Sequence, residues 1–123
     1  MASDNRGRRR ILVVEDETMI AMILEEILAD LGCDVVGPAS KLETAIGLAR
    51  DEVIDAAVLD ITIRGGQVFP VADILLGRGI PFILASGYGE WALPEAFQGM
   101  PRLQKPFTID EAAKAISAIF PAR

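Results

Sequence analysis

The feature that most constrains the fold is the alternation of short apolar runs with longer segments of helical periodicity. Five runs are typical of strands, at 11–14, 34–37, 56–59, 80–85 and 102–104. Apolar residues recur at helical spacing in the segments 20–31, 42–49, 68–75 and 109–120. Continuous apolar strands joined by helices predict a parallel sheet covered on both faces, and right-handed crossovers make it doubly wound. We therefore expect an α/β fold with a five-stranded, doubly wound parallel sheet.

Several residues indicate where the helices begin and end. Gly32 is expected to end the first helix, and Ser40–Glu43 and Thr108–Glu111 both have the spacing of a capping box. The segment 88–99 contains two glycines and a proline, so we expect at most a short helix there, in a mobile segment. Met19, Met22 and Ile23 widen the apolar face of the first helix, with core packing as the default and a partner surface as the alternative.

Composition limits the class of protein. The 123 residues suit one domain, and the net charge of -6 argues against a general nucleic-acid binder. The basic cluster Arg6, Arg8, Arg9 and Arg10 is interpreted as part of a solvated tail. A nucleic-acid or membrane-surface contact is the lesser alternative. We expect a flexible basic tail at 1–9 and one domain at 10–123.

Cys33 is the one cysteine, so no internal disulfide can form, and we interpret it as a small packing residue. No apolar run approaches the length of a transmembrane helix, and a cytoplasmic protein is expected. Histidine is absent, which excludes Ser-His-Asp and Cys-His sites and a phosphohistidine carrier. Any metal must then be held by oxygen, which favours Mg²⁺, Ca²⁺ or Mn²⁺.

Polar residues follow four of the predicted strands. Ligands of such sheets bind where the carboxyl ends of the strands meet, so these residues are candidates for one site. They are Glu15, Asp16 and Glu17 after the first strand, Asp60 after the third, Ser86 and Gly87 after the fourth, and Lys105 and Pro106 after the fifth.

The acidic loop after the first strand requires a counter-charge. It lacks the glycines of a nucleotide-binding loop, and two carboxylates about 4 Å apart repel by roughly 4 kcal/mol at an effective dielectric near 20. Mg²⁺ with carboxylate, carbonyl and water ligands is the natural candidate for Glu15, Asp16 and Asp60, and Lys105 supplies a further positive charge.

A carboxylate beside Mg²⁺ can attack phosphorus and form an acyl phosphate. In this interpretation Asp60 is the nucleophile and Lys105 balances a phosphoryl oxygen. Ser86 donates a hydrogen bond to another oxygen, and Gly87 leaves the site open because it has no side chain.

The ordered set Glu15-Asp16, Asp60, Ser86-Gly87 and Lys105-Pro106-Phe107 resembles the receiver domain of two-component response regulators over nearly the whole chain. The resemblance implies the flavodoxin-like receiver fold, with Asp60 accepting a phosphoryl group. It also implies that Glu15 and Asp16 serve the Mg²⁺ site, that the carbonyl of Thr62 is a further ligand, and that the Lys105–Pro106 peptide is cis.

The resemblance further implies the partners. The donor would be a sensor histidine kinase or a histidine phosphotransfer protein, with no direct nucleic-acid or membrane contact. The chain would be a signalling module rather than an enzyme, catalysing only its own phosphorylation and dephosphorylation. It is expected to be a stand-alone regulator acting through a partner, or else a fragment.

The sequence departs from the common receiver pattern in two places. Ile63–Gly66 replaces the usual Met-Pro after the acceptor loop, and Arg102 occupies the position of a switch aromatic, three residues before the lysine. The loop Ala85–Gly89 resembles that of a subgroup of often stand-alone receivers, in which the segment 88–99 would be the moving part. Tyr88 and Trp91 in this segment are either partner contacts or half-buried loop aromatics.

Two alternatives remain from the sequence. One is a Mg²⁺-dependent phosphatase with an aspartyl nucleophile, whose signature has a second Asp where this chain has Thr62. The other is an unphosphorylated, receiver-like binding module, against which the intact Asp16, Asp60 and Lys105 argue.

Overall fold

A computed structural model describes residues 7–87 and 93–121 of the chain. Within them, five parallel strands form one sheet in the order β2-β1-β3-β6-β7. The strands are β1 (Arg10–Val14), β2 (Asp34–Ala39), β3 (Ala56–Asp60), β6 (Phe82–Ser86) and β7 (Arg102–Gln104). The predicted five-stranded, doubly wound parallel sheet is confirmed.

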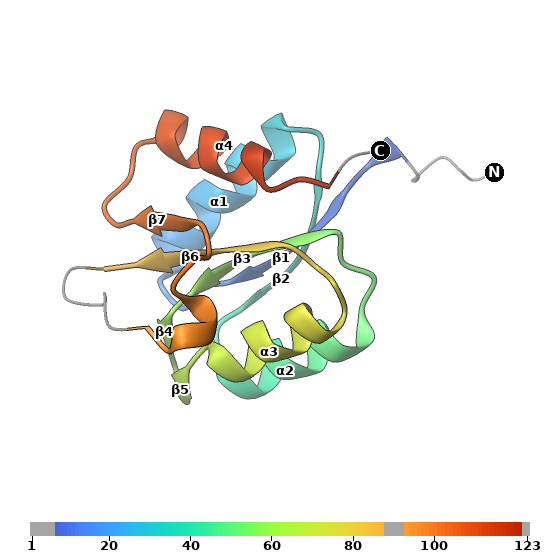
Figure 1. Cartoon of the computed structure of the whole chain (residues 1–123). Helices are drawn as coiled ribbons and strands as arrows, with labels where there is room; N and C mark the ends of the chain where they lie inside the picture. Colours follow the sequence, from blue (N-terminus) through green and yellow to red (C-terminus); the bar gives the residue numbers. More distant parts are fainter. Residues whose placement is uncertain (1–6, 88–92, 122–123) are drawn as a thin grey trace.

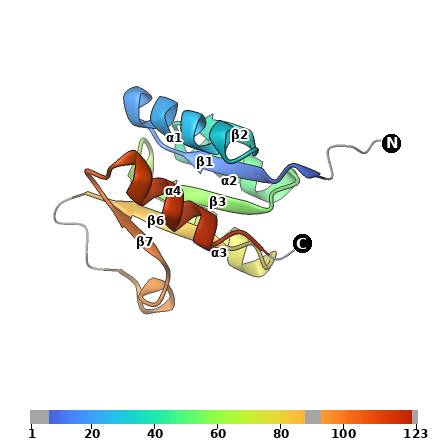
Figure 2. The ribbon, with the colours of Figure 1, turned by 90° about the horizontal axis from the view of Figure 1, so that it is seen from above.

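In the described part of the chain, four α-helices cover the two faces of this sheet. They are α1 (Thr18–Asp30), α2 (Leu42–Asp51), α3 (Phe69–Gly77) and α4 (Ile109–Ala118). Helices α1 and α4 lie on one face, and α2 and α3 lie on the other (Figure 1). Figure 2 shows α1 and α4 side by side over the sheet. Among the described residues, no helix combines the length and the apolar character needed to cross a membrane.

The central strand β3 is buried along its whole length, which explains its continuous apolar sequence. Alternate residues of β3 face opposite sides of the sheet. Ala57 and Leu59 pack into the cluster under α2 and α3, whereas Ala56 and Val58 pack into the cluster under α1 and α4. Asp60, the last residue of β3, is thus held between strands β1 and β6, whose apolar residues are nearly all fully buried.

The two predicted capping boxes have different outcomes. At α4, Glu111 N–H donates to Thr108 Oγ1 over 3.0 Å and Thr108 N–H donates to Glu111 Oε1 over 2.8 Å, so that box is confirmed. The box at Ser40 is wrong, because α2 begins after Lys41 with no side-chain cap. Instead, Leu42 N–H donates to the carbonyl of Arg64 over 2.8 Å.

The stretch after Asp60 forms a small antiparallel hairpin that we did not predict. Its strands are β4 (Thr62–Ile63) and β5 (Gly66–Gln67). Gly65 and Gly66 have φ values of +97° and +139°, a backbone region that favours glycine. At the position where many receivers have Met-Pro, this chain therefore forms a tight turn whose backbone conformation requires glycine.

Three apolar side chains expected in the core are exposed. Met19 and Met22 of α1 are 77% and 58% exposed, so the expected core packing is wrong for both, whereas Ile23 is partly buried against the core. Ile109, expected in the buried stripe of the last helix, is 60% exposed because it is the first residue of α4.

The segment expected to be poor helix contains one turn of 3-10 helix, η2 (Glu95–Phe97). Its first part, with Tyr88 and Trp91, lies outside the described residues.

The described part of the basic segment contacts the domain. Arg8 Nε lies 2.7 Å from Asp34 Oδ1. The Arg9 guanidinium lies 4.8 Å from the Phe120 ring centroid, and Arg9 Nη2 donates to the carbonyl of Pro121. These contacts join the start of β1 to β2 and to the chain after α4.

Gly37 interrupts the pairing of β2 with β1 and supplies a first test of this fold. Its φ is +98°, and a Cβ there would lie 2.8 Å from Ala39 N and 2.9 Å from Val13 O. We expect Gly37→Ala to lower the free energy of unfolding by about 2 kcal/mol or more, because these backbone atoms cannot move away from the added Cβ without disrupting the strand pairing. Urea unfolding followed by circular dichroism measures the loss.

The matched control is Gly47→Ala in α2, where a Cβ would meet no atom within 4 Å. It should stabilise the protein by roughly 0.5–1 kcal/mol, because alanine favours helix. Equal effects of the two substitutions would contradict the local geometry described for β2.

Candidate functional site

The carboxyl ends of β1, β3 and β7 bring three predicted site residues to one edge of the sheet. Glu15 follows β1, and its N–H donates to the carbonyl of Ala39 over 2.9 Å. Asp60 ends β3, where it pairs in register with Ala85 of β6. Lys105 follows β7, and its N–H donates to the carbonyl of Ser86 over 2.8 Å. Backbone hydrogen bonds to neighbouring strands therefore hold each of these positions.

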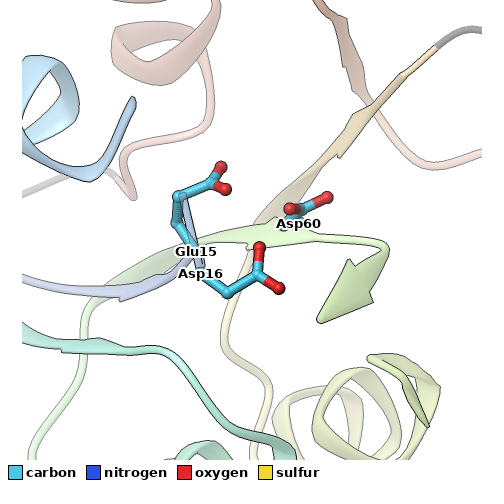
Figure 3. Close-up of side chains that lie close together, drawn as sticks. All are labelled: Glu15, Asp16 and Asp60. Atoms are coloured by element: carbon cyan, nitrogen blue, oxygen red, sulfur yellow. The ribbon is translucent and has the colours of Figure 1, made fainter. Parts of the chain in front are cut away.

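Three carboxylates gather at this edge. Glu15, Asp16 and Asp60 each offer one oxygen, and these oxygens lie within 4.8 Å of one another. Glu15 and Asp16 extend from the loop after β1 and face Asp60 at the end of β3 (Figure 3). Glu15 is 2% exposed and Asp60 is 5% exposed, so water screens their repulsion weakly.

Lys105 supplies positive charge to this cluster. Its Nζ lies 2.9 Å from Glu15 Oε1, 3.0 Å from Asp60 Oδ2 and 3.4 Å from Glu17 Oε2. The contact with Glu17 was not predicted, and it comes from an exposed side chain at the edge of the site. One ammonium thus faces several carboxylates and leaves the cluster with excess negative charge.

Burial and this excess of negative charge together shift the protonation of the site. Burial, followed by the negative charge of Glu15, raises the pKa of Asp60 to about 7, against the opposing effect of Lys105. Burial alone would lower the pKa of Lys105, but the nearby carboxylates of Glu15 and Asp60 outweigh it and raise that pKa. The lysine therefore stays charged at neutral pH, whereas Asp60 sits near its midpoint.

The donor set suits a hard divalent cation. Three carboxylate oxygens, from the loop after β1 and the end of β3, are the ligand type that such ions prefer. Among the described residues, the buried Glu15 Oε1 accepts no well-aligned hydrogen bond, although Lys105 Nζ is near it. A cation here would relieve the charge that raises the pKa of Asp60.

Comparisons with known proteins identify the family of the chain. The chain is 43% identical to SdrG from Sphingomonas melonis Fr1, covering 91% of this chain and 96% of that one with a TM-score of 0.80. It is 26% identical to a response regulator receiver protein from Sinorhizobium medicae WSM419, covering 91% and 94% with a TM-score of 0.77. The chain belongs to the response regulator receiver domains.

Curated sequences support the same family. The receiver is 30% identical over 112 residues to the transcriptional regulatory protein PdtaR of Mycobacterium tuberculosis H37Rv, covering 88% of this chain. It spans 55% of PdtaR, so it matches about half the length of that relative. No family model matches the sequence.

The remaining predicted site residues of the receiver surround the acidic cluster. Ser86 ends β6 and is 3% exposed, and its hydroxyl accepts a hydrogen bond from Arg102 Nη2 over 3.3 Å. Gly87 follows it, and Thr62 lies exposed in β4, two residues after Asp60. The Lys105–Pro106 peptide is cis, as the resemblance implied. A second cis peptide, Gly37–Pro38, was not predicted.

The contact between Arg102 and Ser86 is another feature of the site that sequence reasoning missed. The signal was present, because Arg102 was noted at an unusual position. However, only the pairing of β6 with β7, which aligns Ser86 with Gln104, shows that the arginine can reach the serine.

The raised pKa of Asp60 makes stability depend on pH in the absence of metal. The folded state holds this proton up to about pH 7, whereas the unfolded carboxyl loses it near 3.8. The free energy of unfolding should therefore fall as pH rises from about 4 to 7. We expect Asp60→Asn to be more stable than the wild type by about 1–3 kcal/mol at pH 8, with a smaller difference at pH 4.

Urea unfolding in a chelator, repeated across pH, measures this difference. The control is Asp73→Asn, which removes a carboxylate from an exposed position of α3. A gain for Asp60→Asn that is equal at pH 4 and pH 8 would show that Asp60 carries no unfavourable charge.

Proposed function

We propose that this protein is a phosphoacceptor in a two-component system or phosphorelay. Asp60 takes a phosphoryl group from a phosphohistidine of a sensor histidine kinase or phosphotransfer protein, and the modified domain signals to a partner. The observation that carries this proposal is the buried carboxylate of Asp60, in contact with Lys105 and within 4.8 Å of the Glu15 and Asp16 ligand atoms.

The chemistry follows from these positions. One oxygen of Asp60 forms a bond to phosphorus while the P–N bond to the donor imidazole breaks, and the imidazole keeps the electron pair and takes up a proton. The product is an acyl phosphate on Asp60. Lys105 Nζ, which lies 3.0 Å from Asp60 Oδ2, offers its charge to a phosphoryl oxygen. The hydroxyl of Ser86 donates to another.

Mg²⁺ is the cofactor that this donor set favours, with Glu15, Asp16, Asp60 and the carbonyl of Thr62 as the residues that would hold it. When bound, it neutralises charge on the carboxylates and on the phosphoryl oxygens. One relative supports the choice of magnesium, and a second supports activation at such a site. The receiver domain of sensor histidine kinase PA1611 from Pseudomonas aeruginosa, 23% identical, was solved with magnesium in its active-site cleft. SdrG was solved in a BeF3-activated conformation.

The alternative of a phosphatase has less support. Its second aspartate would stand at position 62, where this chain has Thr62 at the start of the β4–β5 hairpin. A general acid for a leaving alcohol is therefore missing from that position. We infer that the only reactions catalysed are the phosphorylation and dephosphorylation of Asp60 itself.

Chemical phosphorylation tests this function directly. Incubation with acetyl phosphate or phosphoramidate and Mg²⁺ should add the mass of one phosphoryl group to the intact protein. The adduct should be absent in Asp60→Asn and in the presence of a chelator. Asp73→Asn should be modified like the wild type. Rapid hydrolysis of phosphate esters without an adduct would favour the phosphatase, and no adduct with any donor would favour a binding module.

The cation site can be tested separately by calorimetric titration with Mg²⁺. We expect Asp16→Asn to weaken binding at least tenfold, which corresponds to about 1.4 kcal/mol, because it removes a charged ligand. Glu26→Gln in α1 makes the same charge change at an exposed position and should bind like the wild type. If both substitutions weakened binding equally, only the general acidity of the protein would attract the ion.

A further inference from the structure

A buried serine and an exposed arginine are joined at the edge of the proposed site. Ser86 ends β6, directly after Ala85, which pairs with Asp60. Its hydroxyl oxygen accepts a hydrogen bond from Arg102 Nη2 over 3.3 Å. Arg102 starts the edge strand β7, and its backbone pairs with Leu84. The exposed arginine thus reaches back to a hydroxyl that is almost fully removed from water.

Ser86 and Arg102 line a pocket at the ends of β6 and β7. Ser86, Gly87, Arg102 and Gln104 surround a cavity of about 360 Å³. Lys105 links this pocket to the acidic cluster, because its N–H donates to the carbonyl of Ser86 and its Nζ contacts Asp60. Asp60 and Ser86 thus end neighbouring strands at the same edge of the sheet.

Hydrogen-bond capacity decides what Arg102 can do to this serine. A guanidinium only donates, whereas a serine hydroxyl has one proton and two lone pairs. The hydrogen bond from Arg102 uses one lone pair of the Ser86 oxygen. The hydroxyl proton of Ser86 can then be donated to a different acceptor. A charged donor also makes the hydroxyl a stronger donor in turn, since linked hydrogen bonds polarise one another.

We propose that Arg102 is a positioning residue for Ser86. It holds the hydroxyl as an acceptor so that the serine proton is donated to a phosphoryl oxygen on Asp60. The chain thereby uses a charged donor where many receivers have an aromatic side chain. The inference rests on the proposed function, since it concerns the phosphorylated form of Asp60.

Beryllofluoride, which binds aspartate with Mg²⁺ as a phosphoryl mimic, tests this role at equilibrium. At saturating Mg²⁺ we expect Arg102→Gln and Ser86→Ala each to weaken beryllofluoride binding about tenfold. The double variant should bind like Ser86→Ala alone, because Arg102 acts only through the serine. Arg102→Lys, which keeps a charged donor, should recover part of the affinity. The affinity for Mg²⁺ alone should be unchanged in all of these variants.

The control is Arg50→Gln, which removes the same charge from an exposed position of α2. Urea unfolding of each variant shows that the fold is retained. Effects of Arg102 and Ser86 that multiply in the double variant would overturn the proposal, as would an Arg102→Gln variant that binds like the wild type. If the wild type itself bound no beryllofluoride and formed no phosphoryl adduct, the proposed function would fail along with it.

Discussion

The contact of Lys105 with the buried carboxylates of Glu15 and Asp60 is the interaction on which the rest of the site depends. It joins the loop after β1, the end of β3 and the end of β7, which are far apart in the sequence. Removing the lysine would leave two buried carboxylates without their cation, a change that commonly costs several kcal/mol. Even with the lysine present, burial and the negative charge of Glu15 still raise the pKa of Asp60.

The sheet is what makes such a costly cluster possible. Strand β3 is buried on both faces, and its register with β1 and β6 fixes the backbone at Leu59 and Asp60. Two apolar clusters, one on each face of the sheet, stabilise the fold and offset the free-energy cost of burying these carboxylates. A buried carboxylate with a pKa near neutrality therefore depends on residues such as Val58 and Leu59, which pack into these two clusters.

Those parts of the fold that rest on local patterns could be predicted from the sequence. Apolar runs located the five strands of the sheet, and the topology rule for parallel sheets then placed Glu15, Asp60 and Lys105 at one edge. What could not be predicted depends on contacts across the chain. The box at Ser40 fails because Leu42 N–H bonds to Arg64 instead, and that carbonyl belongs to a hairpin whose strands are two residues long.

The same distinction explains why the site residues were easier to identify than their coupling. Asp60 and Lys105 could be identified because they are charged residues directly after predicted strands. The role of Arg102 depends instead on the direction of its side chain, which the sequence does not give. An arginine at that position could have pointed to solvent, as its exposed backbone position suggests. It donates instead to a buried hydroxyl. Because a buried hydroxyl with a charged donor on one side has a preferred direction for its own proton, we infer that this contact couples the proposed acceptor site to the edge strand without an aromatic switch.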